Sequence, residues 1–345
     1  MKIVGCDLHT RYQQIAMLDQ ETGELVERRL EHEGGEARGF YADLSGEVRV
    51  GIEATGHTRW FERMLAELGH ELWIGDAAQI RASVVRKQKT DARDAAHLLE
   101  LLLSERFPRI WRPTMAERDL RQLVWHRQKL VWMRNAVGNQ LHALAMGEGV
   151  CRKKKLFTKK GRAELQSLGL GVWASYRRQE LLTMLDGLDA SLKEMDKAVA
   201  EQAEQNAAAV LLMTHPGVGP VTSLAFVLTL GPVERFERSK QVVSYLGLNP
   251  REHSSGGRQR LGAISKQGNP MMRSLLVEAG HTAARLDSEL RQDYQRLKLR
   301  RGSGVAKVAI ARKLAVRMYW MLRGPASYAQ LVRMQGSPWA TLVKQ

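Results

Sequence analysis

Near its start the chain reads KIVGCDLHTRYQQIAMLD, from Lys2 to Asp19. The first part, up to Asp7, is mostly apolar, a polar turn follows at His9 to Tyr12, and a second apolar segment runs around Gln14 to Leu18. Two short apolar segments joined by a polar turn predict a β-hairpin. Asp7 is then expected at the end of the first strand.

Strands and helices alternate in the segment that follows. Leu25–Leu30 is compatible with a third strand, and Val48–Glu53 is rich in β-branched residues and ends before Gly56. Trp60–Leu68 has the apolar period of a helix, and Leu72–Ile74 is another brief strand. Strands interleaved with helices predict an α/β domain.

After Thr90 the sequence becomes strongly helical. Ala92–Leu103 is rich in helix formers, and Met115–Met146 contains no proline and one glycine, which predicts a single long helix. Between Glu180 and Ala203 an apolar seam steps by four and three residues, as in a coiled coil, at Leu181, Leu185, Leu188, Leu192, Met195 and Val199. The seam fits a coiled coil between subunits and also an amphipathic helix packed on its own domain.

Composition limits the class of protein. The chain has 345 residues, enough for two ordinary domains, and 53 Lys and Arg against 37 Asp and Glu give a net charge of +16. With 44% hydrophobic residues the chain is not disordered, and its charge points to a polyanionic partner. No apolar run approaches the ~20 residues of a membrane span, and no signal peptide is recognisable, so we expect a cytoplasmic protein.

The two cysteines, Cys6 and Cys151, form no C-x-x-C pair. A disulfide framework and a structural zinc site are therefore excluded, which fits a reducing compartment.

Two segments concentrate positive charge. The cationic residues of the linker 151–162, CRKKKLFTKKGR, are Arg152, Lys153, Lys154, Lys155, Lys159, Lys160 and Arg162. We interpret it as a domain junction that contacts phosphates, with a solvated loop as the alternative. The second segment, 295–323, has no acidic residue and carries Arg296, Lys298, Arg300, Arg301, Lys307, Arg312, Lys313, Arg317 and Arg323. It predicts a nucleic-acid-binding face, unless it is a solvated helix surface.

The turn Gly217-Val218-Gly219-Pro220 lies between two apolar helical stretches. It is similar to a helix-hairpin-helix turn, in which the backbone N–H groups near Gly217 and Gly219 can hold a phosphate. A plain turn is the alternative.

Four acidic residues stand at the ends of predicted elements. Asp7 and Glu53 close strands, and Asp91 and Asp94 lie three apart at the start of a helix, on one helical face. Phosphoryl transfer by two Mg²⁺ ions roughly 3.5–4 Å apart requires such a set of oxygen ligands. Each acid alone fits a turn, a surface or a helix-dipole role, but the order strand, strand, helix is that of an RNase H-like (RuvC-like) fold.

Six motifs together resemble the DEDD-type insertion-sequence transposases of the IS110 and IS1111 group, in family order over nearly the whole chain. They are GCD at 5–7, IEATG at 52–56, KTDARDA at 89–95, HPGVGP at 215–220, YLGLNPR at 245–251 and ISKQGN at 264–269. The resemblance implies an RNase H-like catalytic domain at 1–150, a basic linker and coiled coil at 151–206, and a mainly α C-terminal domain at 207–345.

The resemblance also implies roles for residues and partners. Asp7, Glu53, Asp91 and Asp94 would bind Mg²⁺, and Ser255 would be the nucleophile, with the adjacent Ser254 leaving the register open by one. Partners would be target and donor DNA, a structured bridge RNA that pairs with both, and further copies of the chain in a dimer or tetramer. Three cations that follow the serine are expected to hold phosphate, or else are ordinary loop charges: Arg258, Arg260 and Lys266.

The sequence therefore predicts an RNA-guided DNA recombinase that cuts and rejoins strands through serine. One alternative is a RuvC-like nuclease that cuts branched DNA with water as nucleophile. Another is a nucleic-acid-binding protein without catalysis, which four well-placed acids in a basic chain argue against.

Overall fold

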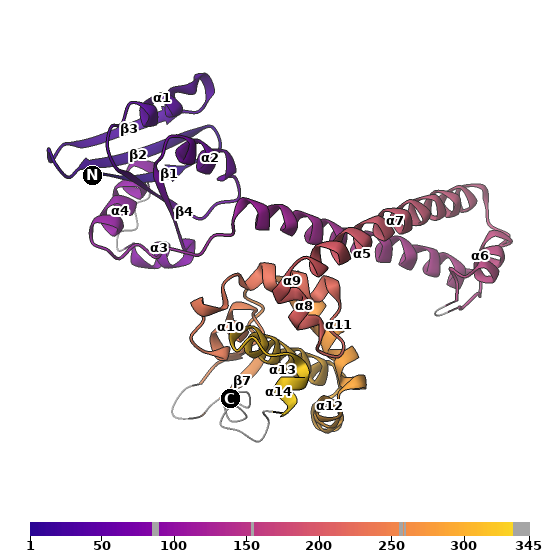
Figure 1. Ribbon diagram of the computed structural model, residues 1–345. Helices are drawn as coiled ribbons and strands as arrows, with labels where there is room; N and C mark the ends of the chain where they lie inside the picture. Colours follow the sequence, from indigo (N-terminus) through magenta and orange to yellow (C-terminus); the bar gives the residue numbers. More distant parts are fainter. Residues whose placement is uncertain (85–89, 153–154, 255–257, 259, 334–345) are drawn as a thin grey trace. The chain divides into compact units, whose positions relative to one another are not determined.

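The computed structural model describes residues 1–84, 90–152, 155–254, 258 and 260–333 (Figure 1). The chain divides into two compact units, Met1–Arg112 and Pro113–Gln345. Helix α5 (Met115–Gly147) precedes the basic linker in the sequence. It nevertheless belongs to the second unit, because it packs against α7 (Val172–Glu204) and α9 (Pro220–Leu230). None of the described helices is both long enough and apolar enough to cross a membrane.

The first unit is built on a mixed five-stranded sheet of order β3-β2-β1-β4-β5. Strands β1, β2 and β3 pair antiparallel, whereas β4 lies parallel to β1 and β5 parallel to β4. The strands are β1 (Lys2–Leu8), β2 (Tyr12–Asp19), β3 (Leu25–Glu31), β4 (Val48–Glu53) and β5 (Glu71–Gly75). The predicted hairpin and the three later strands are confirmed.

Helices cover both faces of this sheet. One core joins buried strand residues to α1 (Glu36–Ala42) and α2 (Arg59–Glu67), with Tyr41 and Phe61 fully buried. A second core, on the other face, joins Ile3 and Ala16 to α3 (Ala77–Ser83) and α4 (Asp91–Leu103). The unit is therefore a three-layer α/β structure, as the alternating pattern predicts.

The second unit is mostly helical. Its main core buries apolar side chains of α8, α9, α10, α11 and α13 together with the adjoining ends of α5 and α7. Its helices beyond α5, α7 and α9 are α6 (Lys159–Gln166), α8 (Ala207–Met213), α10 (Ser239–Tyr245), α11 (Pro270–Leu286), α12 (Ser288–Arg301), α13 (Ser303–Arg323) and α14 (Tyr328–Arg333). A short antiparallel pair, β6 (Pro250–Glu252) and β7 (Leu261–Ile264), is its only described sheet.

Helices α5 and α7 run side by side as an arm, with α6 at its far end (Figure 1). The seam residues Leu181 and Leu185 are buried against Leu141 of α5 and Leu165 of α6. Arg127 forms a salt bridge with Asp196, and Arg134 forms one with Asp189, so charged pairs also join the two helices. Near the end of the arm, the seam is thus covered by α5 and α6 of the same chain. This agrees with the alternative prediction of an amphipathic helix packed on its own domain.

The two basic segments are partly neutralised inside the fold. In the linker, Arg152 pairs with Glu164 and Arg162 with Asp186. Lys153 and Lys154 lie outside the described residues. In the C-terminal segment Arg317 is only 5% exposed and pairs with Asp287, so the prediction that it belongs to a nucleic-acid-binding face is wrong. A run of like charges indicates a solvent-exposed segment. The acidic partner of Arg317, Asp287, lies 30 residues earlier in the chain, outside this run.

Candidate active site

Two glycines bring helix α4 onto the sheet. Gly5 of β1 and Gly51 of β4 lie opposite each other in the parallel register. A Cβ on Gly5 would stand 2.3 Å from the Ala95 carbonyl oxygen and 2.4 Å from the Leu99 nitrogen, and one on Gly51 would stand 2.7 Å from Leu102. The absence of a side chain at Gly5 lets the α4 backbone lie directly on β1, and its absence at Gly51 makes room for the Leu102 side chain.

This packing determines where the acids lie. Because side chains alternate along a strand, Asp7 and Glu53, two residues after the glycines, project from the same face as the glycines. The first turn of α4 carries Asp91 and Asp94, on the N-terminal side of the residue that touches Gly5. Strand order and helix contact together place all four acids on one face of the sheet.

Three ligand-type side chains meet in a small cluster. One oxygen or nitrogen each of Asp7, His9 and Asp91 lie within 4.8 Å of one another. His9 Nε2 is 3.1 Å from Asp7 Oδ2 and 3.5 Å from Asp91 Oδ2. The Tyr12 hydroxyl donates a hydrogen bond of 2.8 Å to Asp91 Oδ2. We call Asp7, His9 and Asp91 the acid cluster.

The other two predicted acids stand beside this cluster. Asp94 is close enough for its charge to raise the pKa of Asp7. Glu53 is half-buried at the end of β4, and its Oε1 lies 3.9 Å from the guanidinium of Arg81. Among the described residues, then, His9 links Asp7 to Asp91, and Glu53 lies outside the cluster.

Electrostatics make the cluster a place for a cation. Burial raises the pKa of Asp7, the charge of His9 lowers it, and the charges of Asp94 and Asp91 raise it again. Burial and the neighbouring acids disfavour the negative charge of Asp7, and a bound cation would offset that cost, as His9 does in part. Carboxylate oxygens are the ligands that hard divalent ions prefer, so the residues present fit such an ion.

Sequence reasoning did not include His9 and Tyr12 among the site residues. The two rings stack with centroids 4.6 Å apart, and the Arg29 guanidinium lies 3.7 Å from the centre of the Tyr12 ring. A signal for His9 exists in the sequence, since His9 follows Asp7 by two residues and so continues the same face. The contact of Tyr12 with Asp91 spans 79 residues and has no local signal.

In the second unit, the motifs at 245–251 and 264–269 contact each other. A Cβ on Gly247 would stand 1.8 Å from the Gln267 carbonyl oxygen, and one on Gly268 would stand 2.2 Å from the Tyr245 carbonyl oxygen. Both glycines have positive φ, which only glycine adopts without strain. The Ser265 hydroxyl donates a 2.6 Å hydrogen bond to Asn249 Oδ1. These contacts join the segments before and after the serine.

Between the strands of this hairpin lies the predicted nucleophile region. Ser255 is outside the described residues, whereas the Ser254 hydroxyl donates to Glu252 Oε1 at 2.6 Å and accepts from the Arg260 backbone N–H at 3.1 Å. The side chains of Arg258, Arg260 and Lys266 are exposed or partly exposed around the hairpin.

The glycine-rich turn connects α8 to α9. Gly217 has φ +87°, and a Cβ there would stand 2.5 Å from the Ala283 nitrogen, so this glycine packs the turn onto α11. Gly219 is exposed, has open space around it and precedes α9. Of the two glycines predicted to hold phosphate, Gly219 is therefore the more exposed, whereas Gly217 is only partly exposed and packs against α11.

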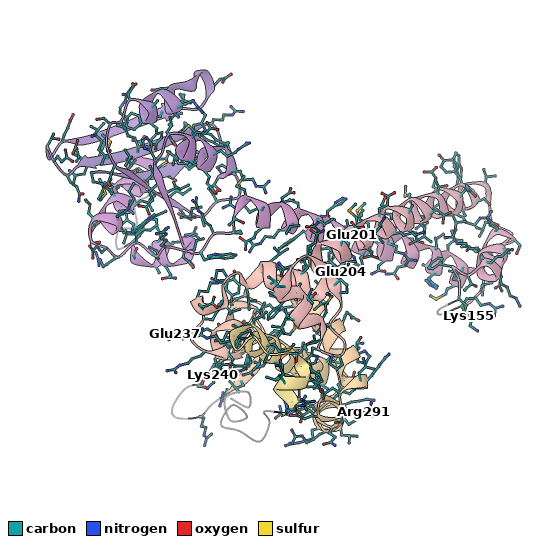
Figure 2. The ribbon with its side chains drawn as sticks, in the orientation of Figure 1. Lys155, Glu201, Glu204, Glu237, Lys240 and Arg291 are labelled. Carbon is teal, nitrogen blue, oxygen red and sulfur yellow. The ribbon has the colours of Figure 1, made fainter. Side chains whose placement is uncertain are left out.

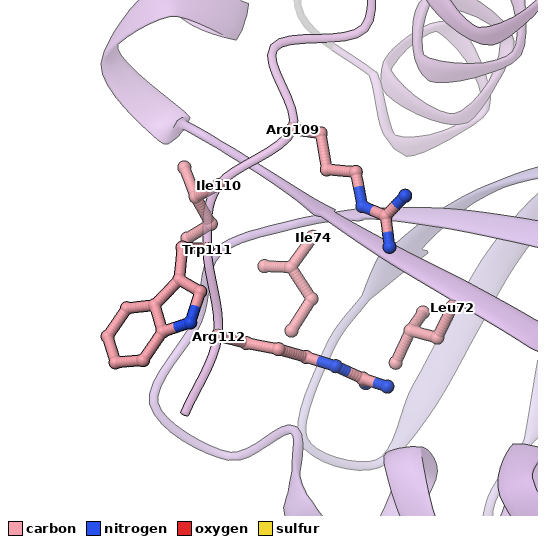
Figure 3. A pocket seen from close by; sticks show the side chains of 6 residues that line it. All are labelled: Leu72, Ile74, Arg109, Ile110, Trp111 and Arg112. Atoms are coloured by element: carbon pink, nitrogen blue, oxygen red, sulfur yellow. The ribbon is translucent and has the colours of Figure 1, made fainter. Parts of the chain in front are cut away.

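A hollow of about 490 Å³ lies beside β5 (Figure 3). Leu72 and Ile74 form its apolar floor, and Arg109 and Arg112 stand at its sides. Arg109 lies 3.7 Å from Glu71, and Arg112 lies 3.4 Å from Glu62. Both cations thus have acidic partners, and none of the four predicted acids lines the hollow.

Two family models match separate parts of the chain. A DEDD transposase model of the IS110 type matches residues 4–147, and a model described as "Transposase IS116/IS110/IS902 family" matches residues 209–295. The first match contains the acid cluster, and the second contains the glycine-rich turn and the serine hairpin.

Relatives match over almost the whole chain. A "probable family 20 transposase" of Pseudomonas aeruginosa is 28% identical, over 92% of this chain and 96% of its own length. The transposase for insertion sequence element IS1111A of Coxiella burnetii is 27% identical, over 95% and 91%. The transposase for insertion sequence element IS1328 of Yersinia enterocolitica is 26% identical, over 79% and 83%.

An α/β unit with clustered carboxylates, joined to a helical unit and matched throughout by transposases, defines a DNA-cutting transposase. More particularly, the chain belongs to the IS110 family of insertion-sequence transposases, as its motifs predict.

Proposed function

We propose that this transposase cuts and rejoins DNA strands through a phosphoserine intermediate at Ser255, with two Mg²⁺ ions held by Asp7, Glu53, Asp91 and Asp94. A structured bridge RNA would select target and donor DNA. The observation that carries the proposal is the meeting of Asp7, His9 and Asp91 on the face that α4 covers. The place of action would be the bacterial nucleoid.

The RNase H-like assignment draws support from the topology. An antiparallel hairpin, β1 and β2, is extended by β3 on one side and by two parallel strands on the other. Acids at the ends of β1 and β4 and at the start of α4 then lie on one face, which is the arrangement that the family resemblance implies for its catalytic acids.

Bound Mg²⁺ would stabilise the negative charge that develops on the scissile phosphate and lower the pKa of the attacking hydroxyl. Asp7, Asp91, Asp94 and Glu53 would supply the oxygen ligands, and His9 would orient the carboxylates of Asp7 and Asp91. Tyr12, which donates to Asp91, would leave the other oxygen of that carboxylate for the ion.

In the chemical step the Ser255 hydroxyl would attack the phosphorus of a DNA phosphodiester. A bond forms between Oγ and phosphorus, a DNA hydroxyl leaves with a proton, and the serine proton passes to water. The phosphoserine ester keeps the bond for rejoining to another strand. The engagement of Ser254 with Glu252 and with the Arg260 backbone favours Ser255 as nucleophile, because Ser254 already holds the hairpin.

The remaining parts of the proposal concern partners. The lysine-rich linker, including Lys153, Lys154 and Lys155, and the cations Arg258, Arg260 and Lys266 would neutralise nucleic-acid phosphates. Gly219 would offer the backbone N–H groups at the start of α9 to a phosphate, and Gly217 would hold that turn in place. Because the α7 seam is largely buried within the chain, other exposed surface of the arm would take part in a dimer that becomes a tetramer on DNA.

The nuclease alternative keeps the acid cluster and replaces serine by water. A suicide DNA substrate separates the two, because only serine chemistry leaves protein covalently joined to DNA. We expect an adduct with the unsubstituted protein and with Ser254→Ala, and none with Ser255→Ala. An adduct that survives in Ser255→Ala and disappears in Ser254→Ala would move the nucleophile by one residue. Cleavage without any adduct would reject the serine mechanism.

A further inference from the structure

The end of the arm exposes two aromatic side chains that no core uses. Trp173 is 82% exposed and Tyr176 is 63% exposed, both in the first turns of α7. They are three residues apart and therefore share one face of the helix. The core of the arm is complete without them, since Leu181, Leu182 and Leu185 of the same helix are buried.

The segment that leads into this face is rich in cations. Residues 151–180 contain nine Lys and Arg against two Glu. Lys155, Lys159 and Lys160 are exposed and form no salt bridge with any residue that the structure describes. Figure 2 places Lys155 at the end of the arm, whereas Glu201 and Glu204 lie toward the other end of α7. The positive charge is therefore concentrated at the end of the arm where α7, with its exposed aromatics, begins.

This combination argues against a second copy of the chain as the occupant. A two-fold contact would bring the same patch of each copy together, so the lysines would face lysines. Like charges across an interface cost free energy, whereas a polyanion releases counterions when it meets them. Charge complementarity thus favours a nucleic acid.

The aromatic rings indicate which kind of nucleic acid. A duplex keeps its bases stacked inside and offers none to an indole or phenol ring. Unpaired bases, typical of RNA loops and bulges, stack on such rings, and base–aromatic stacking tolerates many sequences. Because the DNA substrate is a duplex before cleavage, a loop of RNA is the better fit.

We propose that Trp173 and Tyr176 form a stacking platform for unpaired bases of an RNA loop, whose phosphates Lys155, Lys159 and Lys160 neutralise. The inference rests on the proposed RNA partner and adds where on this chain an unpaired segment of it would bind.

The test uses full-length protein and a hairpin RNA with a uridine-rich loop, with the same stem as a blunt RNA duplex for comparison. We expect Trp173→Ala to weaken loop binding by about 5- to 150-fold, the effect of losing one stacked base, and to leave duplex binding unchanged. Trp173→Phe should retain most of the affinity, because a ring remains. Trp132→Ala is the matched control, since Trp132 is also exposed (46%) and lies on α5 of the same arm.

Four results would overturn the proposal. Unchanged loop binding in a Trp173→Ala, Tyr176→Ala double variant would reject the platform, as would equal losses for loop and duplex. Equal losses with a DNA hairpin of the same sequence would reassign the platform to unpaired DNA. Sedimentation that shows a dimer becoming a monomer in Trp173→Ala, with RNA affinity unchanged, would make the patch a contact between copies.

The serine assay keeps this inference separate from the proposed function. Platform variants that bind the loop normally while the covalent adduct still forms would reject the platform alone. A selective loss of loop binding in a protein that forms no adduct would retain the platform and reject the serine mechanism.

Discussion

Two groups of carboxylates in this molecule have opposite electrostatic surroundings. In the second unit, Arg317 is buried and lies 2.9 Å from Asp287 and 2.7 Å from Glu289. In the first unit, Asp7 and Asp91 have His9 as their partner, and no lysine or arginine of the described ranges forms a salt bridge with either. The ion pairs with Arg317 stabilise the fold around Asp287 and Glu289. The carboxylates of Asp7 and Asp91 lack such a partner and can bind a metal cation instead.

The pKa directions express this difference. Burial raises the pKa of Asp7, and its acidic neighbours raise it further. Burial also raises the pKa of Asp287, but the Leu290 backbone N–H, the Tyr328 hydroxyl and Arg317 outweigh burial and hold that pKa below its usual value. The comparison makes the acid cluster a candidate catalytic site and the group around Arg317 a structural one.

The largest expected effect is on catalysis. Asp7→Asn removes a proposed metal ligand without removing a cationic contact, so strand cleavage in Mg²⁺ should fall by about a thousandfold, the rate equivalent of several kcal/mol of transition-state stabilisation. Nucleic-acid affinity should stay the same. Asp43→Asn, at an exposed acid of the same unit, should cleave normally. Full cleavage by Asp7→Asn would remove Asp7 from the site.

Glu53→Ala and Asp94→Ala test the other acids in the same assay. Both should lose cleavage and keep nucleic-acid binding. Since Glu53 stands outside the acid cluster, an active Glu53→Ala would restrict the ligand set to the strand β1 and helix α4 acids.

In the second unit, we expect substitutions of paired cations to change the free energy of unfolding. Arg317→Leu leaves the buried carboxylate of Asp287 without its ion pair and should lower the free energy of unfolding by about 3 kcal/mol. Lys313→Leu removes a much more exposed pair with Asp293 and should cost less than about 1 kcal/mol. Denaturant titration measures both. Equal small losses would mean that Arg317 does not stabilise the fold.

A smaller loss is expected where the fold holds the acid cluster in place. Gly5→Ala forces a methyl group onto the backbone of α4, which must shift, so we expect a loss of about 2 kcal/mol together with reduced cleavage. Gly39→Ala, in α1 with open space around it, should instead gain about 0.5–1 kcal/mol. Thermal unfolding that does not distinguish Gly5→Ala from Gly39→Ala would contradict the role of Gly5.

Much of the first unit is predictable from local pattern, because strand alternation and helix capping act over a few residues. Thr90, which precedes Asp91, accepts a hydrogen bond from the Arg93 backbone N–H and so starts α4 where the acids stand. The sequence therefore locates the four acids at element ends. It cannot show that Glu53 faces Arg81 while Asp91 faces His9, since both contacts depend on how the elements pack.

The prediction for Arg317 is wrong for the same reason, because its contacts depend on how the helices pack. A cation in a basic stretch is expected in solvent, and only the packing of α13 against the start of α12 brings Asp287 and Glu289 to it. Tyr328, far along the chain, also donates to Asp287. Long-range ion pairs of this kind leave no periodic signal in sequence.

The smallest expected effect is on stability as pH and metal change. Between the usual pKa of an aspartate and the raised pKa of Asp7, the folded state binds more protons than the unfolded state, so Asp7 makes stability fall as pH rises through that window. Asp287 acts in the opposite sense, because its stabilisation is present above the usual pKa and is lost as pH falls through the lowered one. In metal-free buffer near neutral pH, Asp7→Asn should therefore unfold at a slightly higher temperature than the unsubstituted protein, and Asp287→Asn at a lower one.

Mg²⁺ at ten times its dissociation constant should stabilise the unsubstituted protein by about 1.4 kcal/mol and Asp7→Asn by much less. Equal stabilisation of both proteins by Mg²⁺ would show that the ion binds elsewhere, and the contrast between the two carboxylate groups would then not identify the catalytic site.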